Sequence, residues 1–464
     1  MLFHTWPFLL FFVAFYALYL ALRSTRLRLP LLLGASYVFY GWWNPLYLLL
    51  IIYSTLVDYL AVRGMSRGGR KKSWLVLSLL NNLFLLGFFK YGEFVVENLN
   101  EGLSLLGPGW VLPSPDVLLP VGISFYTFQS MSYTIDYWRG KIEVEPNFIR
   151  FAAFVALFPQ LFAGPIERAS SLLPQLKKPP RITAGDVSEG LSLFVVGLFK
   201  KAALASYLAI YVDRVYANPV GSSSWALLCA TFFFAWQIYF DFSGYTDMAR
   251  GIARMMGIRL MVNFNNPYLA VDLGDFWRRW HISLSTWFRD YVYIPLGGSR
   301  GGRARTLAAI ALTMVVSGLW HGAAWTFVAW GALHAAGRLL TLPIEKSAFY
   351  RTKVPRALKQ LLVFSFVLLT WIFFRAESLT DAWLVLDKIL AIVPGGFRGS
   401  TEPLYPLLAL LLVLGAWSWQ LLYESRVRRL LELQPVRIAA VILMVIYLAL
   451  VPAAGDEAFI YFQF

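Results

Sequence analysis

The sequence predicts an all-α, polytopic integral membrane protein. Of its 464 residues, 58% are hydrophobic and only 14% are charged, and the mean hydropathy is +0.60. Water-soluble domains carry roughly 25% charged residues, so this chain lacks the polar surface that contact with water requires. A series of apolar segments also approaches the ~20 residues that a spanning helix needs. We expect about ten to twelve crossings, with partial-depth and interfacial helices between them.

The apolar segments run along the whole chain and show no internal repeat, which disfavours solenoids and duplicated-half transporters. The first, Trp6–Leu22, is too long for a signal-peptide core and lacks a basic start, so we expect a retained anchor. We therefore treat residues 1–464 as a single transmembrane domain. The segments lie near residues 5–22, 29–42, 45–62, 73–90, 117–138, 190–212, 224–240, 306–320, 323–340, 357–374, 404–422 and 436–452.

Charges between the segments predict the orientation of the chain. Basic residues follow the first and third segments, so these loops should be cytoplasmic. The uncharged turn at 41–45 and the acidic stretch 93–116 should face outward, together with Met1. Such basic loops explain the net charge of +15, and we expect no nucleic-acid partner. The orienting residues are Arg23, Arg26, Arg28, Arg63, Arg67, Arg70, Lys71, Lys72, Arg426, Arg428 and Arg429.

The stretch 263–305 is too polar to span a membrane and too aromatic for an ordinary loop. Its aromatic and apolar residues recur at three- and four-residue steps, which predicts an amphipathic helix in the interface or partway into the protein. Polar segments at membrane depth survive beside protein or a water-filled cavity, so the stretch indicates a cavity. The predicted helical face consists of Trp277, Trp280, His281, Leu284, Phe288 and Tyr291.

Histidines supply the candidate catalytic groups. His321 lies between two glycines in an apolar run, and an ionisable group at membrane depth is functional by default. An imidazole can accept a proton near neutral pH, which makes His321 a candidate base; a packing hydrogen bond is the alternative. His281 could belong to the site or only to a wet interface. We interpret His334 as a helix-end residue and His4 as a terminal interfacial one.

Two acids, Asp241 and Asp247, follow an aromatic-rich span. A buried carboxylate needs a partner, and we consider Arg278, Arg279 or a histidine whose tautomer the acid would fix. Both an orienting role and a structural ion pair between helices remain open.

A glycine-rich, basic stretch at 296–303 contains Ser299 and Arg300. Glycines let backbone N–H groups approach phosphate, and arginine binds it bidentately, although the stretch fits neither the P-loop nor the dinucleotide pattern. These two residues, with Arg278 and Arg279, are candidates for binding a phosphate-bearing donor. A flexible cytoplasmic turn is the commoner explanation. Cys229 is the only cysteine, and we expect no metal site.

Six motifs occur in an order that resembles the membrane-bound O-acyltransferase family, specifically its bacterial alginate O-acetylation branch. The similarity extends from residues 37–40 to the closing residues 459–464. One such motif would be a weak signal, whereas six in sequence are specific. The motifs occupy residues 121–128, 162–165, 239–248, 263–268, 276–285 and 319–322.

The resemblance implies a helical membrane body around a central tunnel, in the bacterial inner membrane. It matches His321 to the family's near-invariant histidine and His281 to the second histidine of its motif. It further implies that an acetyl group leaves a cytoplasmic thioester, acetyl-CoA or an acyl carrier protein, and crosses the membrane to an extracytoplasmic, alginate-like polysaccharide. Partner acetyltransferase proteins would assist in the periplasm. Because a thioester is already activated, no bound cofactor or metal is expected.

Three alternatives remain at this stage. The acceptor could be peptidoglycan or another cell-wall polymer, or the acyl group could go to a lipid or a protein. A transporter that performs no chemistry would also have many helices and buried ionisable groups. Such a transporter should tolerate His321→Gln far better than a base-catalysed transferase would.

Overall fold

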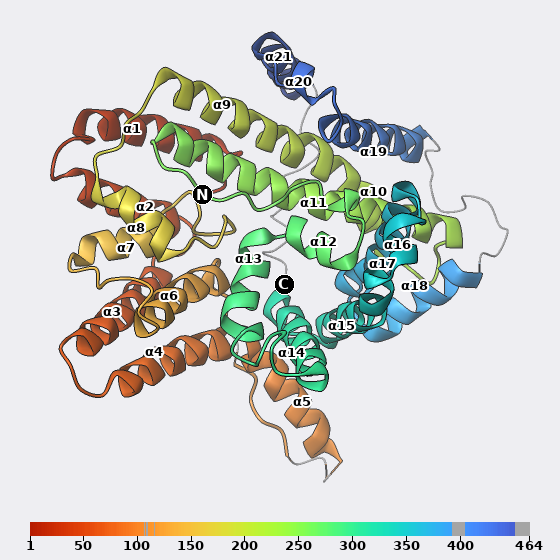
Figure 1. Ribbon diagram of the computed structural model, residues 1–464, viewed down its shortest axis with the longest axis horizontal. Coiled ribbons are helices and arrows are strands. Elements are labelled where there is room, and N and C mark those ends of the chain that lie inside the picture. The colour runs from red at the N-terminus through yellow and green to blue at the C-terminus, as the bar shows by residue number, and fades with distance from the viewer. Residues whose placement is uncertain (106, 108–109, 116, 392–403, 451–464) are drawn as a thin grey trace. The chain divides into compact units, whose positions relative to one another are not determined.

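The computed structural model describes residues 1–105, 107, 110–115, 117–391 and 404–450. All regular structure in these residues is helical, which confirms the predicted fold class (Figure 1). Within the same ranges, eight helices or continuous helical runs are long and apolar enough to cross a membrane, and Trp6–Leu22 and Gln434–Leu450 are shorter apolar helices. Asp116 and the closing motif at 459–464 lie outside the described residues.

Two further predicted segments form helices shorter than a spanning helix. The segment at 29–42 is α2 (Arg28–Gly41), with 14 residues, and the segment at 117–138 becomes α6 (Ile123–Trp138), with 16. Gly122 delays the start of α6 because its backbone is left-handed, with φ of +79°. A side chain at Gly122 would also lie 2.6 Å from the carbonyl oxygen of Leu161, so only glycine fits this turn.

The chain divides into two compact units, of which the first comprises Met1–Phe194 and Met248–Met261 and the second Val195–Asp247 and Val262–Phe464. The single-domain organisation stays a prediction. In the first unit α3 packs against α4 and α6, and α2 packs against α7. Helices that begin in this unit are α1 (Trp6–Leu22), α2, α3 (Tyr47–Ser66), α4 (Lys71–Leu86), η1 (Gly87–Tyr91), α5 (Gly92–Ser104), α6, α7 (Phe148–Ala156), α8 (Ala169–Lys177) and α9 (Ala184–Leu198).

A buried carboxylate joins three helices of the first unit. Asp58 on α3 accepts hydrogen bonds from Ser78 Oγ (2.5 Å) and from Asn82 Nδ2 (2.9 Å to each carboxylate oxygen), both on α4. Ser130 on α6 donates to the same carboxylate. A buried charge is tolerated when it is hydrogen-bonded, so this polar cluster sets how α3, α4 and α6 pack.

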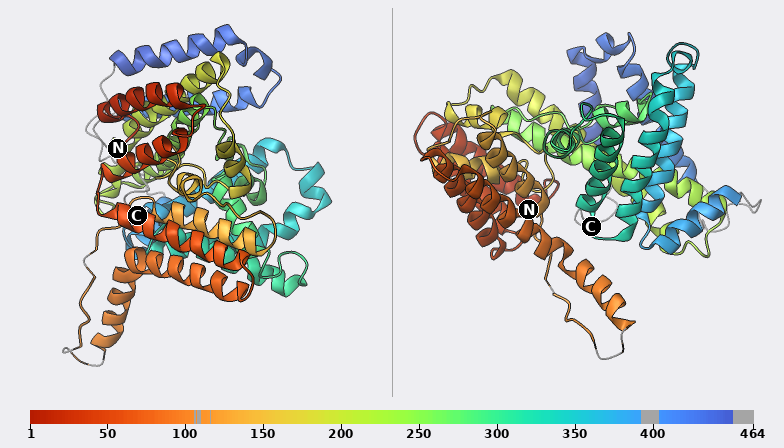
Figure 2. Two further views of the ribbon diagram at one scale, coloured as in Figure 1. Left: turned by 90° about the vertical axis from the view of Figure 1, so that its left-hand side faces the viewer. Right: turned by 60° about the horizontal axis from the view of Figure 1, so that its bottom comes forward.

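The helical run from Lys71 to Ser104 contains 34 residues. At 1.5 Å per residue it is about 50 Å long, longer than a hydrocarbon layer of ~30 Å. Figure 2 shows its last part, α5, standing away from α1–α4. The acids Glu93, Glu97 and Glu101 lie on this protruding part, consistent with a segment that reaches water.

In the second unit, α14 (Arg303–His321) and α15 (Trp325–Lys346) pack along each other. Two glycines allow this close approach: a Cβ atom on Gly318 would lie 2.2 Å from the carbonyl oxygen of Phe327, and one on Gly331 would lie 2.5 Å from that of Met314. The remaining elements are η2 (Phe199–Ala205), α10 (Ser206–Tyr216), α11 (Ser224–Met255), η3 (Pro267–Leu269), α12 (Leu273–Arg279), α13 (Ile282–Phe288), η4 (Arg289–Tyr293), α16 (Ala348–Thr352), α17 (Arg356–Arg375), α18 (Leu379–Ala391), α19 (Leu404–Tyr423), α20 (Arg428–Leu431) and α21 (Gln434–Leu450).

Replacing Gly318 by alanine should separate α14 from α15. Overpacking of this kind typically lowers stability by about 1–3 kcal/mol, so we expect a lower melting temperature in detergent. Gly415→Ala on α19 is the matched control, since nothing lies within 4 Å of a Cβ atom there. Equal melting temperatures for the two variants would contradict the close contact.

Candidate functional site

The polar stretch after Asn263 breaks where the sequence predicts a continuous helix. α12 ends at Arg279 and α13 begins at Ile282, while His281 between them has left-handed backbone angles of φ +41° and ψ +55°. The prediction of one amphipathic face that includes Trp277 and Leu284 is therefore wrong. A left-handed backbone is uncommon for residues other than glycine, and its occurrence at a candidate site residue indicates a stored constraint.

The loop at 263–265 holds this turn on both sides. Asn265 N donates to Arg279 O, and Ile282 N donates to Asn263 O, both at 2.9 Å. The Asn263 side-chain oxygen also accepts from Ser283 N (3.1 Å) and Ser283 Oγ (2.9 Å). Asn263 is 1% exposed. Sequence reasoning quoted its motif but assigned it no role; the structure shows that it fixes the turn that carries His281.

His281 and His321 come together in the second unit. Their ring centroids are 6.3 Å apart, and the two residues are 0% and 2% exposed. Phe242 and Trp320 contact the His281 ring at 4.6 and 5.9 Å, whereas Trp330 and Phe374 contact the His321 ring at 5.2 and 5.3 Å. Both imidazoles are closed off by aromatic side chains in this conformation. The central tunnel stays a prediction.

Burial favours the uncharged form of the His281 imidazole. Burial lowers the pKa of His281 to about 3, because desolvation penalises the imidazolium form. At neutral pH His281 can therefore donate or accept a hydrogen bond but carries no charge.

The interpretation of His334 as a helix-end residue is wrong. α15 continues to Lys346, so His334 lies in its middle, and it is 1% exposed. Its Nε2 atom is 3.0 Å from Thr370 Oγ1 on α17. The apolar pattern could not reveal where α15 ends, because Pro343 lies inside the helix. His4 is half-buried near the N-terminus.

Asp241 and Asp247 each form an ion pair with a lysine. Lys201 Nζ lies 2.6 Å from Asp241 Oδ1, and Lys200 Nζ lies 2.6 Å from Asp247 Oδ2. The prediction that Arg278 or Arg279 pairs with these acids is therefore wrong. Two consecutive lysines inside the apolar segment at 190–212 were the overlooked signal. These lysines lie on the π-helical turn η2 and the acids on α11, an arrangement that favours the structural ion pair of the two alternatives.

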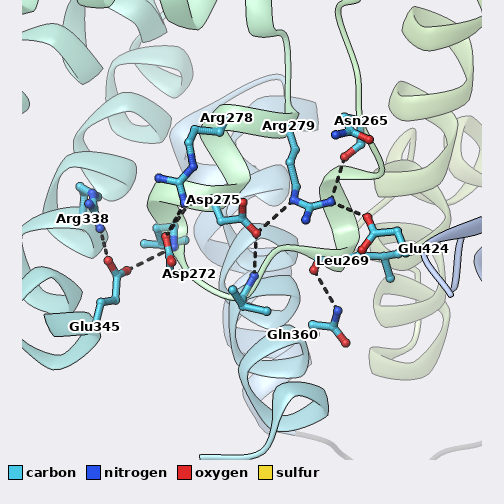
Figure 3. Close-up of polar contacts among 12 residues, drawn as sticks. Asn265, Leu269, Asp272, Asp275, Arg278, Arg279, Arg338, Glu345, Gln360 and Glu424 are labelled. Carbon is cyan, nitrogen blue, oxygen red and sulfur yellow. Dashed lines mark hydrogen bonds and ion pairs between the residues drawn. The ribbon is translucent and has the colours of Figure 1, made fainter. Parts of the chain in front are cut away.

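Arg278 and Arg279 belong to a polar network around α12 (Figure 3). Arg279 pairs with Asp275 Oδ2 (3.0 Å) and Glu424 Oε1 (2.5 Å). Arg278 lies 3.5 Å from Asp275 Oδ1, and its side chain is 66% exposed. The side chain of Arg279 is thus held by two acids, and its backbone carbonyl accepts a hydrogen bond from Asn265 N. Arg278 keeps an exposed guanidinium. A donor-binding role stays a prediction for both.

The α12 helix is also attached to α15. Glu345 accepts a hydrogen bond from Leu273 N at 3.2 Å. It also pairs with Arg338, as Figure 3 shows. Glu345 and Glu424 therefore bind opposite ends of α12, at Leu273 and at Arg279.

The glycine-rich stretch at 296–303 is a turn before α14. Ser299 and Arg300 are exposed, and Arg305 Nε donates to Leu296 O at 2.7 Å. This geometry suits the flexible-turn alternative, and donor binding at Ser299 and Arg300 stays a prediction. Among the residues that the structure describes, no group of three or more His, Cys, Asp or Glu could hold a metal ion.

A comparison with known protein families identifies the family of this chain. The model of MBOAT, the membrane-bound O-acyltransferase family, matches residues 141–380. The chain belongs to the membrane-bound O-acyltransferase family. The match includes both central histidines, the two lysine–aspartate pairs and α12. The resemblance seen in the sequence is thus confirmed, and the chain is an O-acyltransferase.

Relatives of several activities cover most of this O-acyltransferase. A Pseudomonas aeruginosa protein named "Probable alginate O-acetylase AlgI" is 43% identical over 389 residues, which are 82% of this chain and 73% of the relative. A peptidoglycan O-acetyltransferase of Helicobacter pylori is 35% identical, over 77% of this chain and 73% of its own. A teichoic acid D-alanyltransferase of Bacillus subtilis is 27% identical, over 54% and 67%.

The Lys201–Asp241 pair supplies a test of the acid's role. Lys201→Met should destabilise the protein strongly, by about 3–5 kcal/mol, because it leaves a buried carboxylate without its partner. Combining it with Asp241→Leu should restore both the melting temperature and acyl transfer, since an apolar pair can replace a structural ion pair. A double variant that is stable but inactive would instead assign Asp241 an orienting role.

Proposed function

We propose that this chain takes an acetyl group from a cytoplasmic thioester and passes it across the bacterial inner membrane for O-acetylation of an extracytoplasmic polysaccharide. The observation that carries the proposal is the buried pair of His281 and His321, 6.3 Å apart between ring centroids. The 43% identical relative is named for alginate O-acetylation, which favours an alginate-like polymer.

His321 acts as the general base in this proposal: it takes the proton of the acceptor hydroxyl, whose oxygen bonds to the acetyl carbon while the C–S bond of the thioester breaks. The leaving thiolate takes up that proton and departs as the free thiol. A hydroxyl is a poor nucleophile at neutral pH, and a positioned base that removes its proton contributes typically 10²–10⁴-fold. His321 is the last residue of α14. It is buried in an aromatic enclosure, by which we mean the rings around the two histidines, among them Trp320, Trp330 and Phe374. That surrounding also keeps water from the thioester, which would otherwise hydrolyse.

His281 orients the acyl group or its acceptor by hydrogen bonding. A low pKa suits this role, because a neutral imidazole holds a partner without competing for the proton that His321 removes. The left-handed turn fixes the direction of the ring, and a fixed geometry is what makes a bound reactant reactive.

The donor arrives from the cytoplasm in this proposal, as acetyl-CoA or an acyl carrier protein. The exposed guanidinium of Arg278 and the exposed Arg300 could pair with its phosphate groups. Partner acetyltransferase proteins would then deliver the group to the polymer in the periplasm.

Peptidoglycan is the second candidate acceptor, favoured by the 35% identity to a peptidoglycan O-acetyltransferase. The chemistry at His321 would be the same. Membranes that carry the chain, supplied with radiolabelled acetyl-CoA and either alginate oligosaccharides or peptidoglycan fragments, would distinguish the two acceptors by which one becomes labelled.

His321→Ala should leave the protein folded and inserted but lower acetyl transfer in such membranes by about 10²–10⁴-fold, because the base is lost. His321→Gln should be as inactive, since an amide cannot accept the proton. His4→Ala is the matched control and should be active. Normal acetylation by the His321→Ala variant would remove the proposed mechanism.

A further inference from the structure

His334 is a third buried imidazole beside the catalytic pair. Its ring centroid lies 4.7 Å from the Trp330 ring and 5.0 Å from the Trp277 ring. Trp330 also contacts His321 at 5.2 Å. One indole therefore separates His334 from the proposed base, and the three rings belong to one aromatic enclosure.

The hydrogen bond to Thr370 identifies which nitrogen of His334 carries the proton. Thr370 has one hydroxyl hydrogen, and the carbonyl of Val367, 2.8 Å away, accepts it. The Thr370 oxygen is then an acceptor toward His334 Nε2 at 3.0 Å. Nε2 carries the hydrogen of the neutral ring, and Nδ1 keeps its lone pair.

Rings in contact with His334 carry further polar atoms. In the part of the chain that the structure describes, His334 Nδ1, Trp277 Nε1 and Trp330 Nε1 are buried atoms with no hydrogen-bond partner. Leaving a buried polar group unsatisfied is unfavourable by about 1–3 kcal/mol, so each such group calls for an explanation. The cluster offers one acceptor, Nδ1, and two N–H donors on rings that touch it.

A hydroxyl group is the complement of this set. Its hydrogen can be donated to His334 Nδ1, and its oxygen can accept from an indole N–H. We infer that His334, with Trp277 and Trp330, forms a binding site for a hydroxyl group next to His321. This inference rests on the proposed function, in which an acceptor hydroxyl must enter the enclosure. Water carries the same O–H chemistry and is the other source.

A packing role alone does not explain these contacts. The Thr370 hydrogen bond uses only Nε2. Placing an ionisable ring at membrane depth is costly, and residues of this kind are functional by default. A glutamine or threonine could complete the contact to Thr370, but neither would place an acceptor where Nδ1 of His334 lies.

Two isosteric substitutions separate the nitrogens of His334. Glutamine places its amide N–H near the position of Nε2, so H334Q keeps a donor for Thr370 but loses the Nδ1 acceptor. Asparagine places its oxygen near Nδ1, so H334N keeps that acceptor but loses the Thr370 contact. Thr370→Val removes the Thr370 contact alone, and His4→Gln is the control.

The assay uses membranes of the producing strain with the variant in place of the native gene, radiolabelled acetyl-CoA and alginate oligosaccharides as the probe. We expect H334Q to lower the rate of acetyl transfer to the oligosaccharide about tenfold, the usual effect of one lost hydrogen bond. H334N and Thr370→Val should lie closer to the native protein. If water is the source, H334Q should instead change only the hydrolysis of acetyl-CoA without acceptor.

The inference is overturned if H334Q matches the native protein in both reactions, or if Thr370→Val is as impaired as H334Q, because packing then explains His334. Melting temperatures show which variants are folded. Failure of the proposed function is separate: it would appear as normal acetylation by His321→Ala, whatever the His334 variants do.

Discussion

The left-handed turn at His281 is the constraint on which the candidate site depends. Without it, α12 and α13 would continue as one helix, and the His281 ring would follow the helical face that the sequence pattern suggests. Four hydrogen bonds from Asn263 and Asn265 hold the turn. Glu424 and Glu345 attach α12 to neighbouring helices. Strain of this kind, typically about 1–3 kcal/mol, persists only where the surroundings over-determine it.

Charge burial is handled in two ways in this chain. Asp58 in the first unit is surrounded by hydroxyl and amide donors, whereas Asp241 and Asp247 in the second unit are neutralised by consecutive lysines. Hydrogen bonds satisfy the carboxylate oxygens in the first case, and a lysine offsets the negative charge in the second. Asp241 directly precedes Phe242, whose ring contacts that of His281 at 4.6 Å.

Much of the fold could be predicted from the sequence because hydropathy determines which segments can enter a membrane. Eight predicted segments coincide with helices able to span it. His321 stood out as a polar residue in an apolar run, whereas His281 was a candidate because of its place on a predicted amphipathic face. The helix break at His281, the lysine partners of the acids and the central position of His334 could not be predicted. Each depends on contacts between residues distant in sequence, such as Asn263 with Ser283 or His334 with Thr370, which no local pattern encodes.

The central claim is that His281 and His321 belong to one acyl-transfer site. A cryo-EM structure of the full chain with a non-transferable thioether analogue of acetyl-CoA tests it most directly. We expect the acetyl-like end of the analogue between the two rings, within about 3–3.5 Å of an imidazole nitrogen, with aromatic side chains displaced from their present positions. An analogue bound elsewhere, with both rings still enclosed by Phe242, Trp320, Trp330 and Phe374, would contradict the account.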